Sequence, residues 1–378
     1  MRAAAAQNPG SAELRLRLAT LLNHQNAFDD TIDLLTGHAP ETLGFHELKL
    51  LAAAHMALRG GEHWQCAAAA ARQAVVRAEN DGDRATAHAD WAGALFRLDQ
   101  PAAAVAHLKN ALVLDPHNKD ACKRLAHHLL RRDDPAAVIA FTDRLAAAGV
   151  HHARLLTSRV LAFARLGRID AARETIGLHS FGHQQALPAP VGWASIDAFN
   201  AALVEELRQH PGLRYGRYGT ASRDTWRIDV LATGAAPIAR QLLDAIIAAV
   251  GRHLANLPDH AHPWLAARPA AGMMRSWCVI TEGDGFEEWH VHPYGWMSGV
   301  YYAEVPETVM TGSDAGGCLA FGLPEDMVGQ AAAAAFGEQL VRPAPGLLML
   351  FPSHTYHRTY KHGGSARRVC VAFDIWPE

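Results

Sequence analysis

Three histidines in the second half of the sequence have the spacing of metal ligands. His290 and His292 stand one residue apart in EEWHVHPYGWMSGVYY, and His357 ends PAPGLLMLFPSHTYH. Side chains two residues apart on a strand project to the same face, so we expect His290 and His292 to reach one ion from a strand. Three neutral imidazoles suit iron, zinc, copper or nickel, and they leave positions on an octahedral ion open. The pattern therefore predicts a catalytic metal site.

Two adjacent arginines begin the last apolar segment, RRVCVAFDIW. Strand alternation sends Arg367 and Arg368 to opposite faces. We expect Arg368 inside because it shares its face with the small residues Cys370 and Ala372, and Arg367 stays the alternative. A guanidinium suits a carboxylate. A cosubstrate with a carboxylate at one end and a metal-chelating group at the other would bridge the arginine and the ion.

Other polar residues near these motifs compete for roles in the site. Tyr302 is a candidate for contact with the cosubstrate, and the alternative is a packing aromatic. Glu288 is a candidate substitute ligand. His354 is assigned to the loop before His357, because the chain has 23 histidines and a single one is more often surface or core than a ligand.

The sequence around the motifs has the pattern of a β domain with flanking helices. Two amphipathic helices and five strands are expected, with Gly, Pro and Asp clusters between the strands. The helices are 196–210 and 237–257, and the strands are 274–281, 296–305, 317–321, 346–351 and 367–376. Several short strands at this spacing suggest a sandwich or a jelly-roll barrel.

The first half of the chain contains a helical repeat. RLDQPAAAVAHL begins at Arg97, and RRDDPAAVIAFT and RLGRIDAARETI follow at intervals of 34 residues. In each, an arginine closes one helix, a polar turn follows, and a small-residue face opens the next. Ala104, Val138 and Ala172 lie one period apart, where two helices would cross closely. The unit resembles the tetratricopeptide repeat, which predicts an α-helical solenoid stabilised by stacking.

The repeats offer a concave surface for a peptide or protein segment. The alternative is a helical platform that supports only the second domain or a homodimer. The stretch LHSFGHQQALPAPVGWAS has no helical period and is assigned as the linker. The expected organisation is a repeat domain at 1–178, a linker at 179–192 and a second domain at 193–378.

The second half of the chain also resembles a known family. The motifs WHVHPYGWMSGVYY, FPSHTYH and RVCVAFD, in that order, resemble those of the 2-oxoglutarate- and Fe(II)-dependent oxygenases, in the bacterial branch fused to tetratricopeptide repeats. The resemblance implies a double-stranded β-helix, or jelly roll, and the cofactors Fe(II) and 2-oxoglutarate. It implies that His290, His292 and His357 bind the iron and that Arg368 binds the far carboxylate of 2-oxoglutarate.

The resemblance also implies an activity. We expect a dioxygenase that hydroxylates a peptide, protein or carrier-bound substrate presented by the repeats. Most of the family has a carboxylate where this chain has His292, so a two-histidine site without His292 stays open. Two other hypotheses are a three-histidine cupin-type metalloenzyme that does not use 2-oxoglutarate, and a non-catalytic repeat adaptor with a degenerate barrel.

Composition excludes several classes of protein. The formal net charge is -3 and 49% of residues are hydrophobic, so no basic surface for nucleic acid is expected. No stretch approaches the length of a transmembrane helix, and the N-terminus is a poor signal peptide. Five widely spaced cysteines without a CxxC pair indicate free thiols. We expect a cytoplasmic protein that binds neither nucleic acid nor membrane.

Overall fold

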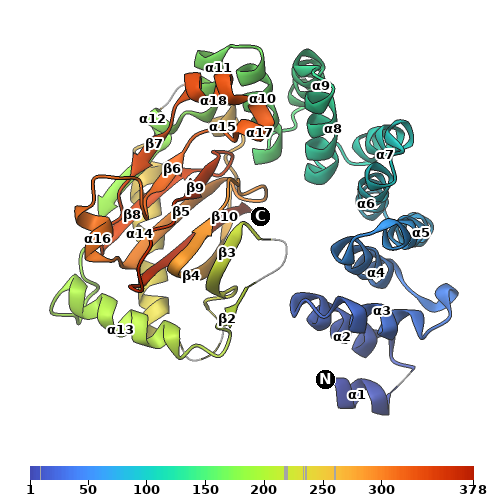
Figure 1. Cartoon of the computed structure of the whole chain (residues 1–378), viewed down its shortest axis with the longest axis horizontal. Helices are drawn as coiled ribbons and strands as arrows, with labels where there is room; N and C mark the ends of the chain where they lie inside the picture. The colour runs from blue at the N-terminus through green and yellow to red at the C-terminus, as the bar shows by residue number, and fades with distance from the viewer. Residues whose placement is uncertain (9, 217–219, 233, 235, 259–260) are drawn as a thin grey trace. The chain divides into compact units, whose positions relative to one another are not determined.

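The chain forms two compact units. The computed structural model describes residues 1–8, 10–216, 220–232, 234, 236–258 and 261–378 (Figure 1). The first unit comprises Met1–Arg132 and the second Asp133–Glu378. Each unit is described by itself below.

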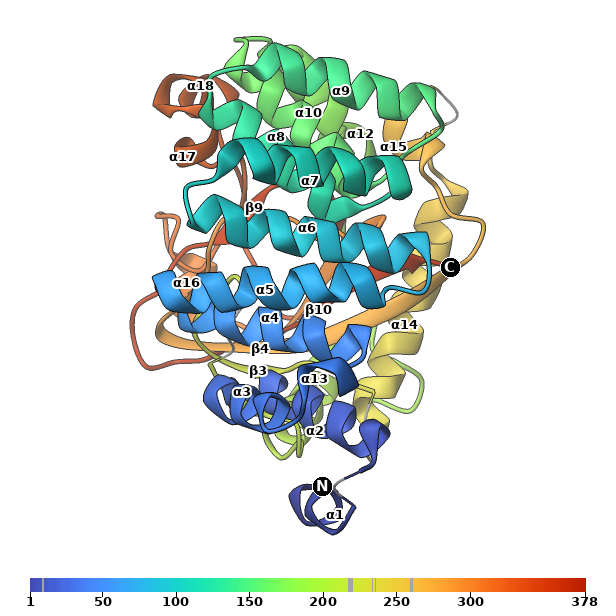
Figure 2. The same ribbon diagram turned by 90° about the vertical axis from the view of Figure 1, so that its right-hand side faces the viewer.

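The first unit is entirely helical within its described residues. Consecutive helices contact each other, and so do alternate helices such as α4 and α6. Figure 2 shows α5, α6 and α7 as successive, roughly parallel rows. The helices are α1 (Arg2–Gln7), α2 (Ala12–His24), α3 (Phe28–Thr36), the 3-10 turn η1 (Pro40–Thr42), α4 (Phe45–Leu58), α5 (Gly61–Arg77), α6 (Asp81–Arg97), α7 (Pro101–Leu114) and α8 (Lys119–Arg131).

The 34-residue period is confirmed in the backbone. The turns before α7, α9 (Pro135–Ala147) and α11 (Ile169–Ile176) each contain a left-handed residue. These residues are Asp99, Asp133 and Gly167, with φ of 54°, 56° and 71°. The small residues expected at close helix crossings are fully buried, namely Ala104, Val138 and Ala172. The same turn and the same close contact therefore recur at the spacing read from the sequence.

The second unit combines helices with two antiparallel sheets. Its remaining helices are α10 (Ala153–Arg165), α12 (Leu178–Phe181), α13 (Ile196–Arg208), α14 (Pro237–Ala255), α15 (Pro263–Ala266), α16 (Glu307–Thr311), α17 (Glu325–Val328) and α18 (Gln330–Phe336). Its strands are β1 (His183–Ala186), β2 (Arg214–Tyr215), β3 (Ser222–Ile228), β4 (Gly272–Glu287), β5 (Met297–Glu304), β6 (Leu319–Phe321), β7 (Gln339–Val341), β8 (Leu347–Pro352), β9 (His357–Thr359) and β10 (Arg368–Pro377). No helix in the described residues is long and apolar enough to cross a membrane.

The two sheets have the arrangement of a jelly roll. The large sheet has the order β1-β8-β5-β10-β4-β3-β2, and the small sheet has the order β7-β6-β9. An isolated bridge between His290 and His357 extends the small sheet by one position. Side chains from both sheets form a shared apolar core, including Val300, Phe321 and Phe351. On β5, the buried Tyr301 lies on the face of the sheet toward α13, where its hydroxyl donates a hydrogen bond to Asn200 at 2.6 Å.

All five expected strands and both expected helices of the second domain are present. Strands β1, β2, β7 and β9 were not predicted, because two to four residues carry too little alternation to be recognised. Strand β3 was also missed, because its sequence, SRDTWRI, is mostly polar. The stretch expected as the linker, 179–192, contains β1, which pairs with β8 through Gln184 and Met349.

Helices α10 and α11 pack on the same turn of chain that carries His357. Thr157 of α10 donates a hydrogen bond from its hydroxyl to the carbonyl oxygen of His354 at 3.2 Å. The buried His354 ring donates from Nε2 to the carbonyl oxygen of Thr175 on α11 at 2.9 Å. These contacts join α10 and α11 to the turn before β9, and the second compact unit begins at Asp133.

The His354 contact predicts a pH-dependent stability. Burial lowers the pKa of His354 from 6.5 to about 4. Below pH 6.5 the unfolded chain therefore binds a proton that the folded chain excludes, and stability falls by about 3 kcal/mol as the pH drops to 4. His354→Gln keeps a donor for Thr175 and removes the titration. Urea unfolding of the second unit at several pH values measures the difference.

The exposed His117 provides a matched control for this substitution. His117→Gln is expected to leave the pH dependence of unfolding unchanged. The same pH dependence in His354→Gln as in the unsubstituted protein would contradict the prediction.

Candidate functional site

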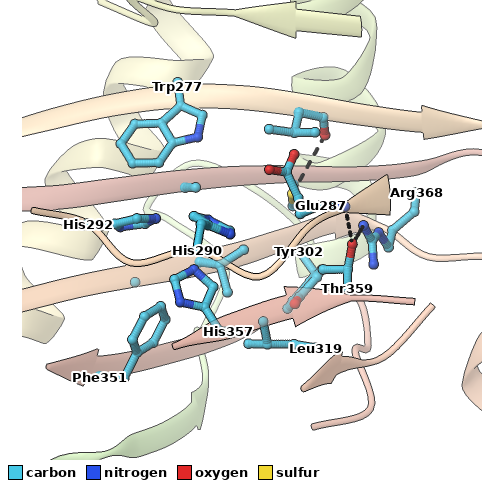
Figure 3. Close-up of a pocket in the computed structure, with 15 residues that line it drawn as sticks. Trp277, Glu287, His290, His292, Tyr302, Leu319, Phe351, His357, Thr359 and Arg368 are labelled. Carbon is cyan, nitrogen blue, oxygen red and sulfur yellow. Dashed lines mark hydrogen bonds between the residues drawn. The ribbon is translucent and has the colours of Figure 1, made fainter. Parts of the chain in front are cut away.

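The three expected histidines converge inside the barrel (Figure 3). One ligand atom from each of His290, His292 and His357 lies within 4.8 Å of the others, so the group could hold a metal ion. His357 is the first residue of β9. His290 and His292 were expected on a strand, but they lie in an extended segment between β4 and β5 with only a bridge at His290. Both rings still face the pocket.

Main-chain hydrogen bonds bring these two distant segments together. The amides of His290 and His357 each donate to the other residue's carbonyl oxygen at 3.0 Å. The amide of His292 donates to the carbonyl oxygen of Ser353, also at 3.0 Å. The separation of the ligands therefore depends on backbone pairing rather than on flexible side chains.

Hydrogen bonds at Nδ1 orient two of the rings. His290 donates from Nδ1 to the carbonyl oxygen of Glu288 at 2.8 Å. His357 donates from Nδ1 to the carbonyl oxygen of Thr355 at 3.0 Å. A carbonyl oxygen only accepts, so the proton of each neutral ring is on Nδ1 and the lone pair is on Nε2. Metal-binding histidines are commonly fixed in this way.

A buried carboxylate orients the third ring. His292 donates from Nδ1 to Oδ1 of Asp374 at 2.5 Å, and the hydroxyl of Ser298 donates to the same oxygen at 2.7 Å. The hydroxyls of Ser298 and Ser353 are 2.7 Å apart. A Cβ at Gly295 would lie 2.5 Å from Oγ of Ser353, so glycine lets the loop approach this network. The network presents Nε2 of His292 to the other two rings.

Burial favours the neutral form of His290 and His357. Burial first, and then the neighbouring His292, lower the pKa of His290 from 6.5 to about 3. The pKa of His357 lies well below its usual value, first because of burial and then because of the other two rings. His290 and His357 therefore each offer a lone pair at pH 7, and a set of three imidazoles suits iron, zinc, copper or nickel.

The other end of the pocket holds a buried guanidinium. Arg368 is 1% exposed, and it donates to the carbonyl oxygen of Gly317 at 2.7 Å and to the hydroxyl of Thr359 at 3.2 Å. Its Nε has no hydrogen-bond partner and it forms no ion pair among the described residues. Glu287 lines the same pocket and interacts electrostatically with Arg368 without forming an ion pair, so the guanidinium can still pair with an incoming anion.

Arg368 lies on the face of β10 that points into the pocket, as the sequence predicts. Arg368, Cys370 and Ala372 all line the pocket. Arg367 does not line it, and its Nε lies 3.9 Å from a carboxylate oxygen of Glu304. The structure therefore brings Arg368, and not Arg367, to the histidines.

Tyr302 and Glu287 complete the polar lining. Burial raises the pKa of Tyr302, so the phenol stays protonated. Tyr302 has no hydrogen-bond partner among the described residues, which leaves its hydroxyl free to donate. Burial also raises the pKa of Glu287, whose Oε1 accepts a hydrogen bond from Ser222 at 2.7 Å. Glu288, the candidate substitute ligand, instead pairs with Arg223 at 2.5 Å.

Sequence reasoning missed the residues that position the ligands. Asp374 stands in the RVCVAFD motif, but the motif alone does not indicate a role for it. It shares its strand face with Arg368, and a carboxylate on the inward face of an apolar strand is a signal of a specific partner. Thr359, which accepts hydrogen bonds from Arg368 and from the amide of Glu287, has no comparable signal.

Comparisons with known families agree with both resemblances. Residues 275–374 match the family described as "Putative 2OG-Fe(II) oxygenase". Residues 95–162 match the tetratricopeptide repeat family. No curated protein sequence matches the chain. The family resemblances inferred from the sequence motifs are therefore confirmed, each over part of the chain.

Similar solved structures exist for both parts. A prolyl-4-hydroxylase from Pseudomonas putida is 16% identical with a TM-score of 0.39, covering 57% of this chain and 100% of its own. HygX from Streptomyces hygroscopicus, with nickel, 2-oxoglutarate and hygromycin B bound, is 13% identical with a TM-score of 0.36, covering 53% and 84%. YrrB, a TPR protein with an unusual peptide-binding site, is 15% identical with a TM-score of 0.34, covering 46% and 91%. With TM-scores this low, these likenesses carry no weight for the function.

Removal of single histidines tests the metal group. Purified protein loaded with Fe(II) without oxygen is expected to hold one ion per chain. His290→Ala, His292→Ala and His357→Ala should each lose most of it, because two imidazoles remain. His117→Ala, at an exposed histidine, should retain the ion. Full iron content in His292→Ala would favour the two-histidine alternative.

The buried carboxylate is expected to tune metal affinity. Asp374→Asn removes the charge that orients His292, and loss of such an outer partner weakens metal binding by about 10- to 100-fold. Competition with a chromophoric chelator measures the affinity. Asp284→Asn, at an exposed aspartate, is the matched control and should leave it unchanged. Equal affinity in both variants would show that Asp374 does not act on the site.

Proposed function

We propose that the protein is an Fe(II)- and 2-oxoglutarate-dependent dioxygenase that hydroxylates its substrate. The observation that carries this proposal is the buried Arg368, which forms no ion pair among the described residues and shares one pocket with three inward-facing imidazoles. A dicarboxylate with a 2-oxo group suits both ends of such a pocket. The family match over residues 275–374 supports the same assignment.

Each group of the pocket has a task in this proposal. His290, His292 and His357 would hold Fe(II) through Nε2. Arg368 would bind the far carboxylate of 2-oxoglutarate, with Tyr302 as a further donor. Bound Fe(II) and 2-oxoglutarate together supply the oxidation of the substrate by O2.

The rest of the lining is suited to excluding water. Val279, Leu319 and Phe351 line the same pocket as the histidines and Arg368. These apolar walls would strengthen the pairing of the carboxylate with the guanidinium, because charges attract more strongly where water is excluded.

The substrate is proposed to be a peptide, a protein or a carrier-bound molecule. Tetratricopeptide repeats form extended binding surfaces, and such repeats occupy residues 95–162. The five cysteines are free, which supports the expected cytoplasmic location.

A three-histidine metalloenzyme that does not use 2-oxoglutarate is the second candidate. The all-imidazole ligand set favours it, since most of the resembled family has a carboxylate in place of His292. This alternative gives no task to the unpaired charge of Arg368, so the first proposal accounts for more of the pocket.

Substitution of the two arginines separates the candidates. Under anaerobic conditions, the Fe(II) protein is expected to give a visible chelate band with 2-oxoglutarate. Arg368→Met should weaken 2-oxoglutarate binding by about 100-fold, as expected for loss of a charge-assisted pair worth about 3 kcal/mol. Arg367→Met is the matched control, because Arg367 is adjacent in the chain but its guanidinium lies outside the pocket.

Iron content of both variants checks that the site is intact. Equal 2-oxoglutarate affinity in Arg368→Met and Arg367→Met would refute the role of Arg368. No chelate band in the unsubstituted, iron-loaded protein would refute the use of 2-oxoglutarate.

A further inference from the structure

A second pocket lies beside the metal pocket, entirely within the second unit. Residues from α11, α12, α18, β6, β7 and the turn before His357 line it, and we name it the α11 pocket. The residues used below are Arg173, Ile176, Leu178, Phe321, Phe336 and Thr355. None of them is assigned to the metal or the cosubstrate above.

The α11 pocket shares a wall with the metal site. The ring of Phe321 lies 5.0 Å from that of Phe351 and 6.2 Å from that of His357, measured between centroids. The carbonyl oxygen of Thr355 accepts the Nδ1 hydrogen bond of His357 at 3.0 Å. A ligand in this pocket would therefore touch two residues that contact a metal-binding ring.

An unpaired hydroxyl in this lining points to a ligand. Thr355 is 1% exposed, and its Oγ1 has no hydrogen-bond partner among the described residues. A buried hydroxyl without a partner costs about 1–3 kcal/mol, and native proteins leave few such groups. A threonine hydroxyl can both donate and accept, so it suits an amide of a peptide main chain.

Part of the pocket wall is apolar, while Arg173, His179, Glu338 and Gln339 supply polar lining. Ile176, Leu178, Phe321 and Phe336 offer surface for an apolar side chain. Arg173 holds α18 against α11, because its guanidinium donates to the carbonyl oxygens at the end of α18 at 2.9 Å and lies 5.6 Å from the Phe336 ring. A preformed pocket binds with less loss of conformational entropy.

We propose that the α11 pocket binds an apolar side chain of the peptide substrate, with the Thr355 hydroxyl paired to the peptide main chain. This inference rests on the proposed function and narrows its substrate class. An extended peptide advances about 3.3 Å per residue. Since Phe321 lies close to His357, the apolar residue is a near neighbour of the oxidised residue in the substrate sequence.

Defined tripeptides test this inference on the full chain. The probes are Ac-Gly-X-Gly-NH2 with X as Gly, Leu, Phe, Asp or Lys. Calorimetry with the Zn(II)-loaded protein measures binding, and the chelate band of the anaerobic Fe(II) and 2-oxoglutarate complex reports any effect on His357. Leu or Phe peptides are expected to bind about tenfold more tightly than Gly, as burial of a large apolar side chain predicts.

Two variants locate the binding. Thr355→Val keeps the shape and the carbonyl oxygen and removes the hydroxyl, so it should retain iron and weaken the Leu peptide by up to about tenfold. Phe336→Ala should weaken it as well. Thr311→Val, at an exposed threonine of α16, is the matched control and should bind as the unsubstituted protein does.

The outcomes separate this inference from the proposed function. Absence of saturable binding, equal binding of all five peptides, or unchanged binding in both Thr355→Val and Phe336→Ala would overturn the α11 pocket as a peptide site. Peptide binding that follows the expected pattern in a protein without a chelate band would overturn the use of 2-oxoglutarate and support the pocket.

Discussion

The charge of Arg368 is buried and hydrogen-bonded to Gly317 and Thr359 without an ion pair, at the opposite end of a pocket from three imidazoles. Removing this charge from water lowers the stability of the folded chain. An anion bound beside the guanidinium would offset that desolvation penalty. The three histidines could likewise bind a cation at this end of the pocket. A metal ion and a carboxylate therefore complete the electrostatics of this interior, and their binding would add to the stability of the folded chain.

One strand links both ends of the pocket. One face of β10 carries Arg368 at its start and Asp374 six residues later, with the small side chains of Cys370 and Ala372 between them. Arg368 would bind the carboxylate, while Asp374 orients His292. The separation between the two is fixed by the rise of a strand paired on both sides, with β4 and β5. The jelly roll thus sets the length of the ligand that can bridge arginine and metal.

The sequence predicted the parts of the site whose residue types are dictated by chemistry. The histidine pair, the distant histidine and the inward arginine follow from ligand preference and strand alternation. The partners of these residues could not be predicted, because they depend on contacts between distant segments. Thr157, for example, bonds to His354, 197 residues later in the chain. Short strands such as β1 and β9 form because neighbouring strands supply their hydrogen bonds, and their own residues give no periodic signal.

A crystal structure of the full chain, grown without oxygen in the presence of Fe(II) and 2-oxoglutarate, tests the central claim most directly. It should contain one ion within about 2.2 Å of Nε2 of all three histidines. A carboxylate of 2-oxoglutarate should lie roughly 2.8 Å from Arg368. An ion bound away from the histidines, or an Arg368 still without an anion when the ion is bound, would contradict the account.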